Sequence, residues 1–581
     1  KKNLKVVRNI LSITALIVAV GCANQVPLTG GLKDETPPVM VNSIPVNYST
    51  QFQGKQLEFF FDEYIQLKNA QQKLIVSPPL KTPPVIKAKT RSIIVNLEEV
   101  PDSLTTYTFN FGDGIADLNE GNSIDNFSFT FSTGAYIDSL SAAGRVVNAA
   151  TLEPEKNMLV MLYNENMDSL PYKSMPYYIT KTDAAGLFYF RNLKQGDYKI
   201  FALNEKNSNY MYDSPDEIIA FSSTLVSPFV RWEADTTQND SLPTVMKKVM
   251  GPDTLVLFAF QEDRIPQKIK KITRKDRWTT EIQFERLCPE KPVVTILKPA
   301  NIPAICSYSQ KNDSLTIWPS DTSFTTMGDS LVFKIDFSRE DSIGNTVFMT
   351  DTVAVPPIFD KRGKPMADKV VPVFQFSTRQ GAFINPGVAT FFDSPWPIIS
   401  FNAAALKVQE MQPDSQWIDI PSDIFKDSLN PCRLYLKLGF SPNKNYKVIA
   451  LPGFIANLKS ANVDTIQVSF GVLAEDVFGN LKLIVENNPS ECWFELSNEK
   501  GQIIQVWAED GPFSRTFNLL PAGKYKLIAF QDINHNRRWD TGLYIIGRQA
   551  EAKYIYEKEI PVRSNWDLEI TWDMTLNSLR K

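Results

Sequence analysis

The chain has 581 residues, too many for one hydrophobic core, so several domains are expected. Hydrophobic residues make up 43% of it and aromatic residues 11%, which is typical of a folded protein and not of a disordered chain. The formal net charge of −4 gives no electrostatic basis for binding nucleic acid, and the single histidine excludes a cluster of histidine metal ligands.

Residues 1–21 have the features of a secretory signal peptide. A basic start is followed by a mostly apolar run, Ile10 to Val20, which is too short to span a bilayer core of about 30 Å. Small residues lead into Cys22, and this arrangement resembles a bacterial lipobox, in which the thiol is acylated and becomes the first residue of the mature protein. A plain secretory peptide with a chance cysteine is the alternative. Acylation would hold the protein on a membrane, because each buried CH₂ group contributes about 0.8 kcal/mol.

Residues 22–39 are rich in proline, glycine and threonine and are expected to form a tether. Residues 40–136 alternate short apolar runs with turn residues, which predicts a β-sandwich, and period-two alternation is clearest at Tyr107–Phe111 and Phe127–Phe131. The segments CANQVPLTGGLKDETPPV, FDEYIQLKNAQQKLIVSPPL, LTTYTFNFGDGIADLNEGN and FSFTFSTG resemble the N-terminal Ig-like domain of Bacteroidota outer-membrane lipoproteins. The resemblance implies an envelope lipoprotein and carries no catalytic residue with it.

Residues 137–235 have a different order of predicted strands and turns. Strands there are separated by the motif T-D-x-x-G-x-F-x-F and by a glycine turn before Tyr198, an order similar to transthyretin-like or carboxypeptidase-regulatory-like β-sandwiches. Such sandwiches are binding or spacer modules and not enzymes. Polar residues at Arg231–Leu242 predict a linker, and Thr244–Met250 is the best short candidate for a helix. Residues 236–365 are expected to form another β-sandwich of unassigned type.

Two gapless internal matches indicate a duplication. One aligns Tyr107 with Tyr446, and the other aligns Tyr198 with Tyr525. The predicted fold class is therefore all-β, with tandem Ig-like and transthyretin-like sandwiches in an elongated multidomain chain. The repeated units are expected as a second Ig-like sandwich at residues 366–475 and a second transthyretin-like sandwich at residues 476–581.

A loop near the C-terminus carries oxygen-bearing side chains at alternate positions. Asp532, Asn534, Asn536 and Asp540 stand at the spacing of positions 1, 3, 5 and 9 of an EF-hand-type calcium loop. The loop resembles the D-x-N-x-N segments of calcium-binding B-type repeats in surface proteins. It departs from the EF-hand pattern because position 6 is Arg537 instead of glycine and position 12 lacks an acid. Calcium binding is one hypothesis, and an Asx-turn loop that closes the strand end is the other.

The duplication gives this loop a counterpart, which is a second calcium candidate. It has the same departure from the EF-hand pattern, since Tyr210 stands at position 6. Within the later loop, Trp539 is a candidate for an exposed contact and His535 is expected to be solvated. The candidate ligands of the earlier loop are Glu205, Asn207, Asn209, Asp213 and, at position 12, Asp216.

Cysteine spacing suggests no zinc or redox motif, because no Cys-x-x-Cys pair is present. Cys288 and Cys306 are close enough in sequence for a disulfide in an oxidising envelope, with buried free thiols as the alternative. Asp62 and Glu63 are adjacent, so on a strand they would face opposite sides and could not share a glycosidase site. No enzymatic activity is expected.

The sequence predicts a non-catalytic lipoprotein anchored to the outer membrane through Cys22. The main hypothesis is a scaffold or accessory interaction subunit of an outer-membrane machine for protein assembly, secretion or uptake, with an outer-membrane protein as partner. The alternative is a surface adhesin or glycan-binding protein that depends on calcium if the loops bind it. No acidic residue lies between Cys22 and Asp34, whereas lipoproteins of the family that reach the cell surface tend to carry acids there. This favours a periplasm-facing orientation.

Overall fold

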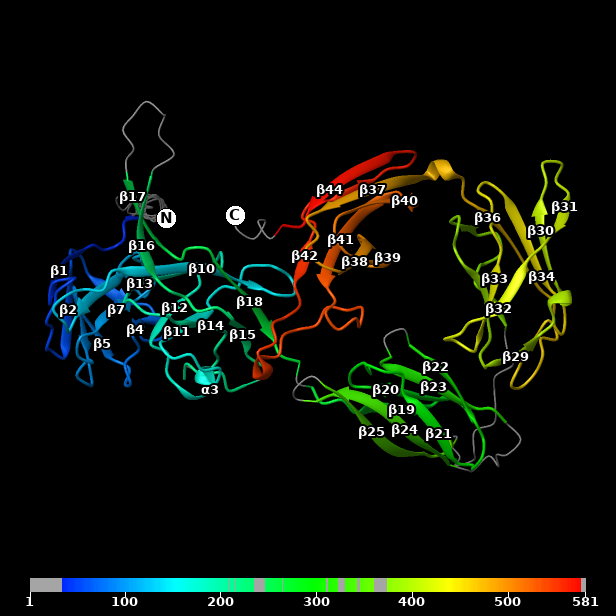
Figure 1. Ribbon diagram of the computed structural model, residues 1–581, viewed down its shortest axis with the longest axis horizontal. Helices are drawn as coiled ribbons and strands as arrows, with labels where there is room; N and C mark the ends of the chain where they lie inside the picture. Colours follow the sequence, from blue (N-terminus) through cyan, green and yellow to red (C-terminus); the bar gives the residue numbers. More distant parts are fainter. Residues whose placement is uncertain are drawn as a thin grey trace, which may run out of the picture.

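The computed structural model describes residues 34–575 apart from 208, 215, 235–245, 264, 310–311, 322–329, 342–344 and 360–373. The described residues are almost entirely β structure, which confirms the predicted all-β class of tandem sandwiches in an elongated chain. They form five packed units, each with its own hydrophobic core. Figure 1 shows the first two units at one end of the long axis, the third and fourth further along, and the fifth returning towards the second.

The first sandwich packs the sheet β1-β2-β6-β5 against the sheet β4-β7-β9, with a separate β3-β8 pair. Phenylalanines fill its core because alternate residues of each strand face inward. Phe59 and Phe129 are fully buried, with ring centroids 4.8 Å apart. Its elements are β1 (Met40–Ile44), β2 (Gln56–Phe61), β3 (Ile65–Leu67), α2 (Ala70–Lys73), β4 (Ile75–Ser77), β5 (Val85–Lys89), β6 (Ser92–Asn96), β7 (Thr106–Asn110), β8 (Ile115–Asp117) and β9 (Ser128–Ser132).

The second sandwich is built on one seven-stranded sheet, ordered β12-β11-β14-β15-β18-β10-β13. Its elements are β10 (Leu140–Asn148), β11 (Leu159–Tyr163), α3 (Leu170–Lys173), β12 (Tyr178–Lys181), β13 (Leu187–Leu193), β14 (Lys199–Leu203), β15 (Ile218–Phe221) and β18 (Leu255–Gln261), with β16 (Phe229–Ala234) and β17 (Met246–Gly251) as a separate pair.

Three expectations about the end of this sandwich are wrong. The boundary after residue 235 falls too early, because β18 pairs in parallel with β10 and antiparallel with β15 inside the same sheet. The expected linker starts within a strand, since Arg231 lies in β16, and the described part of the expected helix is the strand β17, which pairs with β16. Most of the expected linker, from residue 235 onward, lies outside the described residues.

The third sandwich packs the sheet β19-β20-β23-β22 against β21-β24-β25. The four cysteines in the described residues are all free, so of the two hypotheses for Cys288 and Cys306 the structure has free thiols and not the disulfide. Burial raises the pKa of the Cys288 thiol to about 11, which keeps it protonated and unreactive. The strands are β19 (Ile269–Arg274), β20 (Thr280–Phe284), β21 (Val293–Lys298), β22 (Ala304–Tyr308), β23 (Ser314–Pro319), β24 (Leu331–Glu340) and β25 (Thr346–Val355).

The fourth sandwich repeats the strand order of the first. The orders β26-β28-β33-β32, β30-β34-β36 and β29-β35 correspond to β1-β2-β6-β5, β4-β7-β9 and β3-β8. Tyr107 faces Phe131 in the first, and Tyr446 faces Phe470 in the fourth. Its elements are β26 (Gln375–Phe376), β27 (Phe383–Ile384), β28 (Thr390–Asp393), β29 (Ile398–Phe401), η1 (Ala403–Ala405), β30 (Leu406–Met411), β31 (Trp417–Ile420), β32 (Asp423–Lys426), β33 (Arg433–Lys437), β34 (Asn445–Ala450), β35 (Ile455–Asn457) and β36 (Ile466–Val472).

The fifth sandwich repeats the second. Its sheets β39-β38-β41-β42 and β40-β37-β44 correspond to β12-β11-β14-β15 and β13-β10-β18. In both copies a tyrosine hydroxyl, that of Tyr198 or Tyr525, donates to the carbonyl four residues earlier, at 2.8 and 2.7 Å. Its elements are η2 (Glu475–Val477), β37 (Phe478–Glu486), β38 (Cys492–Asn498), β39 (Ile503–Glu509), β40 (Phe513–Pro521), β41 (Gly523–Gln531), η3 (Tyr544–Ile546), β42 (Lys553–Ile555), β43 (Ile560–Val562) and β44 (Asp567–Asp573).

Direct contacts join neighbouring sandwiches. Between the first and second, the Ile179 backbone nitrogen donates to Ser77 Oγ at 3.1 Å. Between the third and fourth, Trp396 Nε1 donates to Asp276 Oδ2 at 3.2 Å, and Lys459 Nζ lies 4.0 Å from the Trp278 ring centroid. The chain is therefore not a string of freely hinged units.

Candidate functional site

The predicted acylation residue, Cys22, lies outside the described residues. Within the part of the chain that is described, none of the helices has the length and apolar character needed to cross a bilayer. The predicted loop residues are all described. His535 is solvated as expected, with its side chain 72% exposed and its Nδ1 3.9 Å from Glu491 Oε2.

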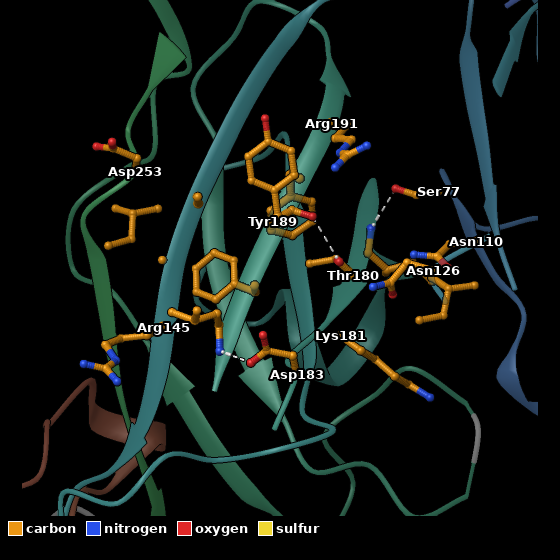
Figure 2. A pocket seen from close by; sticks show the side chains of 18 of the residues that line it. Ser77, Asn110, Asn126, Arg145, Thr180, Lys181, Asp183, Tyr189, Arg191 and Asp253 are labelled. Atoms are coloured by element: carbon orange, nitrogen blue, oxygen red, sulfur yellow. Dashed lines mark hydrogen bonds between the residues drawn. The ribbon is translucent and has the colours of Figure 1, made fainter. Parts of the chain in front are cut away.

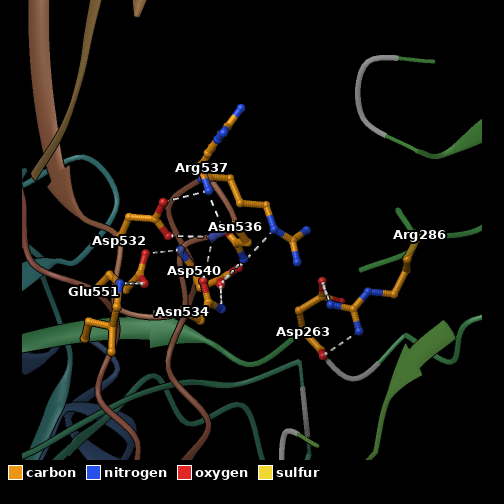
Figure 3. A network of polar contacts seen from close by, with 10 residues as sticks. Asp263, Arg286, Asp532, Asn534, Asn536, Arg537, Asp540 and Glu551 are labelled. Atoms are coloured by element: carbon orange, nitrogen blue, oxygen red, sulfur yellow. Dashed lines mark hydrogen bonds and ion pairs between the residues drawn. The ribbon is translucent and has the colours of Figure 1, made fainter. Parts of the chain in front are cut away.

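The second acid-amide loop, residues 532–540, follows β41 and brings its predicted residues together (Figure 3). Asn534 and Asn536 each donate from Nδ2 to Oδ2 of Asp540, both at 2.6 Å. Asp532 accepts hydrogen bonds from the backbone nitrogens of Asn536 at 2.8 Å and Arg537 at 2.7 Å. Both carboxylates are thus engaged within a compact Asx-turn loop.

The first acid-amide loop, residues 205–213, follows β14 and has the same arrangement. Asn207 and Asn209 donate from Nδ2 to Oδ2 of Asp213, at 2.9 and 2.7 Å. Glu205 accepts hydrogen bonds through Oε1 from the backbone nitrogens of Asn209 and Tyr210. The duplication therefore preserves the side-chain geometry of the loop as well as its sequence.

A buried glutamate that was not predicted holds the second loop in place through hydrogen bonds. Glu551 is 6% exposed and accepts hydrogen bonds from the backbone nitrogen of Ile533 through Oε1 and from that of Asp540 through Oε2, both at 2.9 Å. Burial, reinforced by Asp540 and Asp532 nearby, raises the pKa of Glu551 to about 7, against the lowering effect of its two hydrogen bonds. This carboxyl therefore changes charge near neutral pH.

Glu217 has the same role in the first loop. It is 1% exposed and accepts from the backbone nitrogens of Asp213 at 3.1 Å and Lys206 at 3.4 Å. Asp216, expected at position 12, is exposed, and its neighbour Glu217 holds the loop instead. The signal was hidden because the glutamate follows the last loop aspartate by 4 residues in the first copy and by 11 in the second, so no gapless alignment pairs the two.

Position 6 of each loop adopts the conformation that glycine favours. Tyr210 has a φ of 60° and Arg537 a φ of 62°, both in the left-handed region. The missing glycine therefore does not prevent the loop from closing. The carboxylate at position 1 holds the backbone nitrogen of this same residue in both copies.

The donor set of each loop consists of hard oxygen atoms, which calcium prefers. As the loops stand, the amide nitrogens of the asparagines face the last aspartate, so a cation would require both amides to turn their Oδ1 atoms inward. No group of three or more His, Cys, Asp or Glu side chains has a metal-binding arrangement among the described residues. A cation would thus depend on amide and backbone oxygens as well as on carboxylates.

The extra residues between Asp540 and Glu551 dock on the second sandwich. We call residues 541–550 the clasp, and Figure 1 shows this orange segment meeting the second sandwich beside β15 and β18. Thr541 Oγ1 donates to the Gln261 carbonyl and Gln549 Nε2 to the Phe221 carbonyl, both at 2.8 Å. The clasp therefore closes the chain of sandwiches two to five into a ring.

Tyr544 is the centre of the clasp. Its side chain is 3% exposed, and its ring centroid lies 5.1 Å from that of Phe221 and 5.7 Å from that of Phe201. Its hydroxyl donates to the Asp168 carbonyl, and its backbone nitrogen donates to Oε1 of the buried Glu262 at 2.6 Å. A side chain at Gly542 would lie 2.3 Å from the Phe260 ring, so only glycine permits this approach.

Trp539 was expected as an exposed contact, but it is partly buried against the clasp. Its Nε1 donates to the Glu551 carbonyl at 2.7 Å, and its ring packs beside the Tyr544 cluster. The acid-amide loop, the buried glutamate and the clasp are therefore one continuous structure.

A cavity of about 690 Å³ lies between the first two sandwiches (Figure 2). On β13, Leu187 is 49% and Tyr189 44% exposed, and the Arg191 guanidinium lies 5.1 Å from the Tyr189 ring centroid. Asn110 and Asn126 approach from the first sandwich. A partly exposed aromatic ring framed by amide and guanidinium groups can hold a polar ligand with an apolar face. The corresponding residues of β40 are small and polar: Ser514, Thr516 and Asn518.

Comparison with known proteins identifies one domain. Residues 34–133 match the bacterial Ig-like domain family, which confirms the Ig-like assignment of the first sandwich. The comparison with curated proteins gives no match.

The solved structures that resemble the chain include a surface layer protein, a pilin subunit and a plexin extracellular region. The surface layer protein SbsC, domains 1–6, is 10% identical with a TM-score of 0.15, and 90% of this chain and 67% of that chain are covered. The major pilin subunit BcpA of Bacillus cereus is 9% identical with a TM-score of 0.13, covering 75% of this chain and 99% of that chain. The plexin A4 extracellular region is 7% identical with a TM-score of 0.15, covering 74% and 48%. Similarities this low carry no argument about function.

Proposed function

We propose that the protein is a non-enzymatic lipoprotein of the cell envelope that acts as a scaffold or accessory subunit of an outer-membrane machine for protein assembly, secretion or uptake. The observation that carries the proposal is the clasp, because it fixes sandwiches two to five in a closed ring. A fixed ring presents surfaces of several sandwiches at set distances, which suits a subunit that organises partners. The predicted signal peptide and Cys22 support lipid attachment. The Ig-like first sandwich supports localisation in the cell envelope.

Affinity purification of the full chain from outer membranes in mild detergent tests this proposal. A stoichiometric integral outer-membrane protein should co-purify, and Tyr544→Ala should reduce its recovery by opening the ring. Cys22→Ser should abolish membrane attachment and leave the protein in the soluble envelope fraction. Recovery of the chain alone from cells with intact membranes would contradict the scaffold function.

We propose a periplasm-facing orientation, supported by the absence of acids between Cys22 and Asp34. Protease treatment of intact cells should leave the chain undigested, whereas permeabilised cells should lose it. Complete digestion in intact cells would place the protein on the cell surface instead.

The alternative function is a surface adhesin or glycan-binding protein, and the cavity beside Tyr189 favours it. Binding of soluble oligosaccharides to the full chain, lost in Tyr189→Ala and retained in Tyr136→Ala, would support this alternative. Tyr136 is an exposed tyrosine outside the cavity, so it controls for general loss of aromatic surface.

Calcium dependence belongs to the same alternative. We propose that the second acid-amide loop binds calcium through Asp532, Asn534, Asn536 and Asp540, and that the first loop does so through its matching residues. Calorimetric titration of the full chain with CaCl₂ should give heat that Asp532→Ala and Asp540→Ala remove. Equal heats in the parent and both variants, or none in the parent, would leave the loops as Asx turns only.

A further inference from the structure

A second cavity, of about 910 Å³, lies where the second, third and fifth sandwiches meet. The second sandwich contributes the end of β18, the third contributes residues next to β20 and β24, and the fifth contributes the clasp and the end of its acid-amide loop. Four arginines line this cavity: Arg286, Arg339, Arg538 and Arg548.

The three lining carboxylates already have partners. Asp263 Oδ2 lies 2.5 Å from Arg286 Nη2, a pair visible in Figure 3. Asp341 Oδ1 accepts the backbone nitrogen of Asn345 at 2.8 Å. Asp540 Oδ2 accepts the two asparagine amides of its loop. With four arginines against three engaged acids, the cavity retains positive charge.

Three of the arginines lack acceptors for a buried nitrogen. The Nε atoms of Arg339, Arg538 and Arg548 are buried and donate no hydrogen bond within the described structure. Arg538 Nε does lie 3.4 Å from Asp540 Oδ1, but without hydrogen-bond geometry. A buried donor without an acceptor is unfavourable, and more so when it is charged. The terminal Nη nitrogens of these three side chains are not buried in this way and make no hydrogen bond among the described residues, so they are the donors available to a ligand in the cavity.

The chemistry of the guanidinium group identifies the ligand class. Its planar fork of N–H donors matches the two oxygens of a carboxylate or phosphate, and it remains charged at any physiological pH. Trp539, Leu287 and Ile545 add apolar surface to the lining, so the cavity can also hold the organic part of a ligand. An oxyanion on a small polar molecule fits both features.

We propose that this three-sandwich cavity binds an oxyanion, a phosphate or carboxylate group on a small polar ligand, between Arg339 of the third sandwich and Arg548 of the clasp. The cavity is complete only while the clasp is docked. A ligand held from both sides binds the closed ring better than an open one and so stabilises it by mass action. The cavity is thus a ligand site and a point where small-molecule binding strengthens ring closure.

Calorimetric titration of the full chain tests the proposal with inorganic phosphate, D-glucuronate and, as a neutral analogue of the latter, D-glucose. Phosphate, glucuronate or both should bind, and glucose should not, which also tells whether phosphate or carboxylate is the preferred oxyanion. Arg339→Gln and Arg548→Gln should each weaken binding about tenfold or more, the effect of one lost charged hydrogen bond. Arg563→Gln is the matched control, because Arg563 is exposed and does not line the cavity.

Thermal unfolding with and without the same anions provides a second measurement. The anion that binds should raise the midpoint of the parent and of Arg563→Gln but not that of the double variant Arg339→Gln/Arg548→Gln. Circular dichroism of each variant shows whether it has folded. Arg339→Lys and Arg548→Lys replace any variant that has not folded, and they should still weaken binding because lysine lacks the paired N–H donors of the guanidinium group. Equal affinity in all variants, or no response of the parent to either anion in both measurements, would overturn the proposal.

Discussion

At the residue scale, the acid-amide loops show how a carboxylate can hold the backbone in an unfavourable conformation. A residue with a Cβ atom in the left-handed region costs roughly 1–2 kcal/mol. Tyr210 and Arg537 both take this conformation, and in each case the position 1 carboxylate accepts the hydrogen bond of that residue's own backbone nitrogen. The hydrogen bond therefore offsets the strain, which is why the loops persist without glycine at position 6.

Replacing Arg537 with glycine should stabilise the fifth sandwich. The change removes the left-handed strain but adds chain entropy to the unfolded state, so a net gain of about 0.5–1 kcal/mol is expected. Urea unfolding of the full chain measures it. Arg563→Gly is the control, because φ at this exposed arginine is not positive and glycine should only destabilise there. Equal losses of stability in the two variants would show that position 6 carries no strain.

Glu551 should make the stability of the fifth sandwich depend on pH. Its folded pKa of about 7 lies above the ordinary value of 4.5 for a glutamate, so the folded state binds the proton more tightly than the unfolded state. The resulting stability is fully present below about pH 4.5 and is lost as pH rises through about 7, with roughly 1–2 kcal/mol at stake.

Urea unfolding between pH 5 and 8 measures this dependence. The parent should lose stability across the range, whereas Glu551→Gln should be flatter, since the amide does not titrate. A parallel decline in both proteins would assign the effect to other groups.

At the element scale, the clasp distinguishes the two copies of the duplicated unit. The corresponding connection of the second sandwich is seven residues shorter and ends at Glu217 without leaving its own sandwich. The outer face of the sheet that carries β11, β14 and β15 is apolar, and Tyr544 of the clasp covers it. The insertion in the fifth sandwich therefore covers the apolar outer face of the second.

Tyr544→Ala should open the ring. Truncating a buried aromatic side chain costs about 3–5 kcal/mol, which is large for one docking contact. Small-angle X-ray scattering of the full chain should show an increased radius of gyration. Ile546→Ala is the control, since Ile546 lies in the same short helix, is 39% exposed and should leave the dimensions unchanged. Identical scattering from Tyr544→Ala and the parent would mean that other contacts hold the ring.

Local patterns predicted the strands of the first sandwich because alternation of apolar and polar residues is a short-range signal. Tyr107–Phe111 and Phe127–Phe131 were expected and appear as β7 and β9, shifted by one residue. Strand β18 was assigned to the wrong sandwich because its partner β10 lies more than a hundred residues earlier in the chain, and parallel pairing leaves no local mark.

The candidate loops could be found from residue types and spacing, but the buried glutamates that hydrogen-bond to them could not. Glu217 and Glu551 occupy unequal sequence distances, so they were invisible to a gapless comparison. The clasp and the arginine cavity depend on sandwiches that meet in space through residues hundreds of positions apart. Such contacts arise when whole sandwiches pack against one another, so local sequence patterns do not predict them.

At the scale of the whole molecule, the second to fifth sandwiches form a ring, and the first sandwich is attached to the second. The first two sandwiches are joined by a hydrogen bond, and the third and fourth are joined by the contacts of Trp396 with Asp276 and of Lys459 with Trp278. The clasp then links the fifth sandwich back to the second. The two ends of the described chain, residues 34 and 575, therefore belong to sandwiches on either side of the clasp.

Closure also determines how the molecule would bear tension. A pull applied between residues 34 and 575 passes through the first and second sandwiches, crosses the clasp and enters the fifth, so the third and fourth carry no load while Tyr544 stays docked. Single-molecule stretching should therefore show an early rupture that releases the length stored in those two sandwiches before either unfolds, and Tyr544→Ala should abolish that step. A protein built in this way lengthens under force in one reversible step, because the clasp separates before any sandwich unfolds.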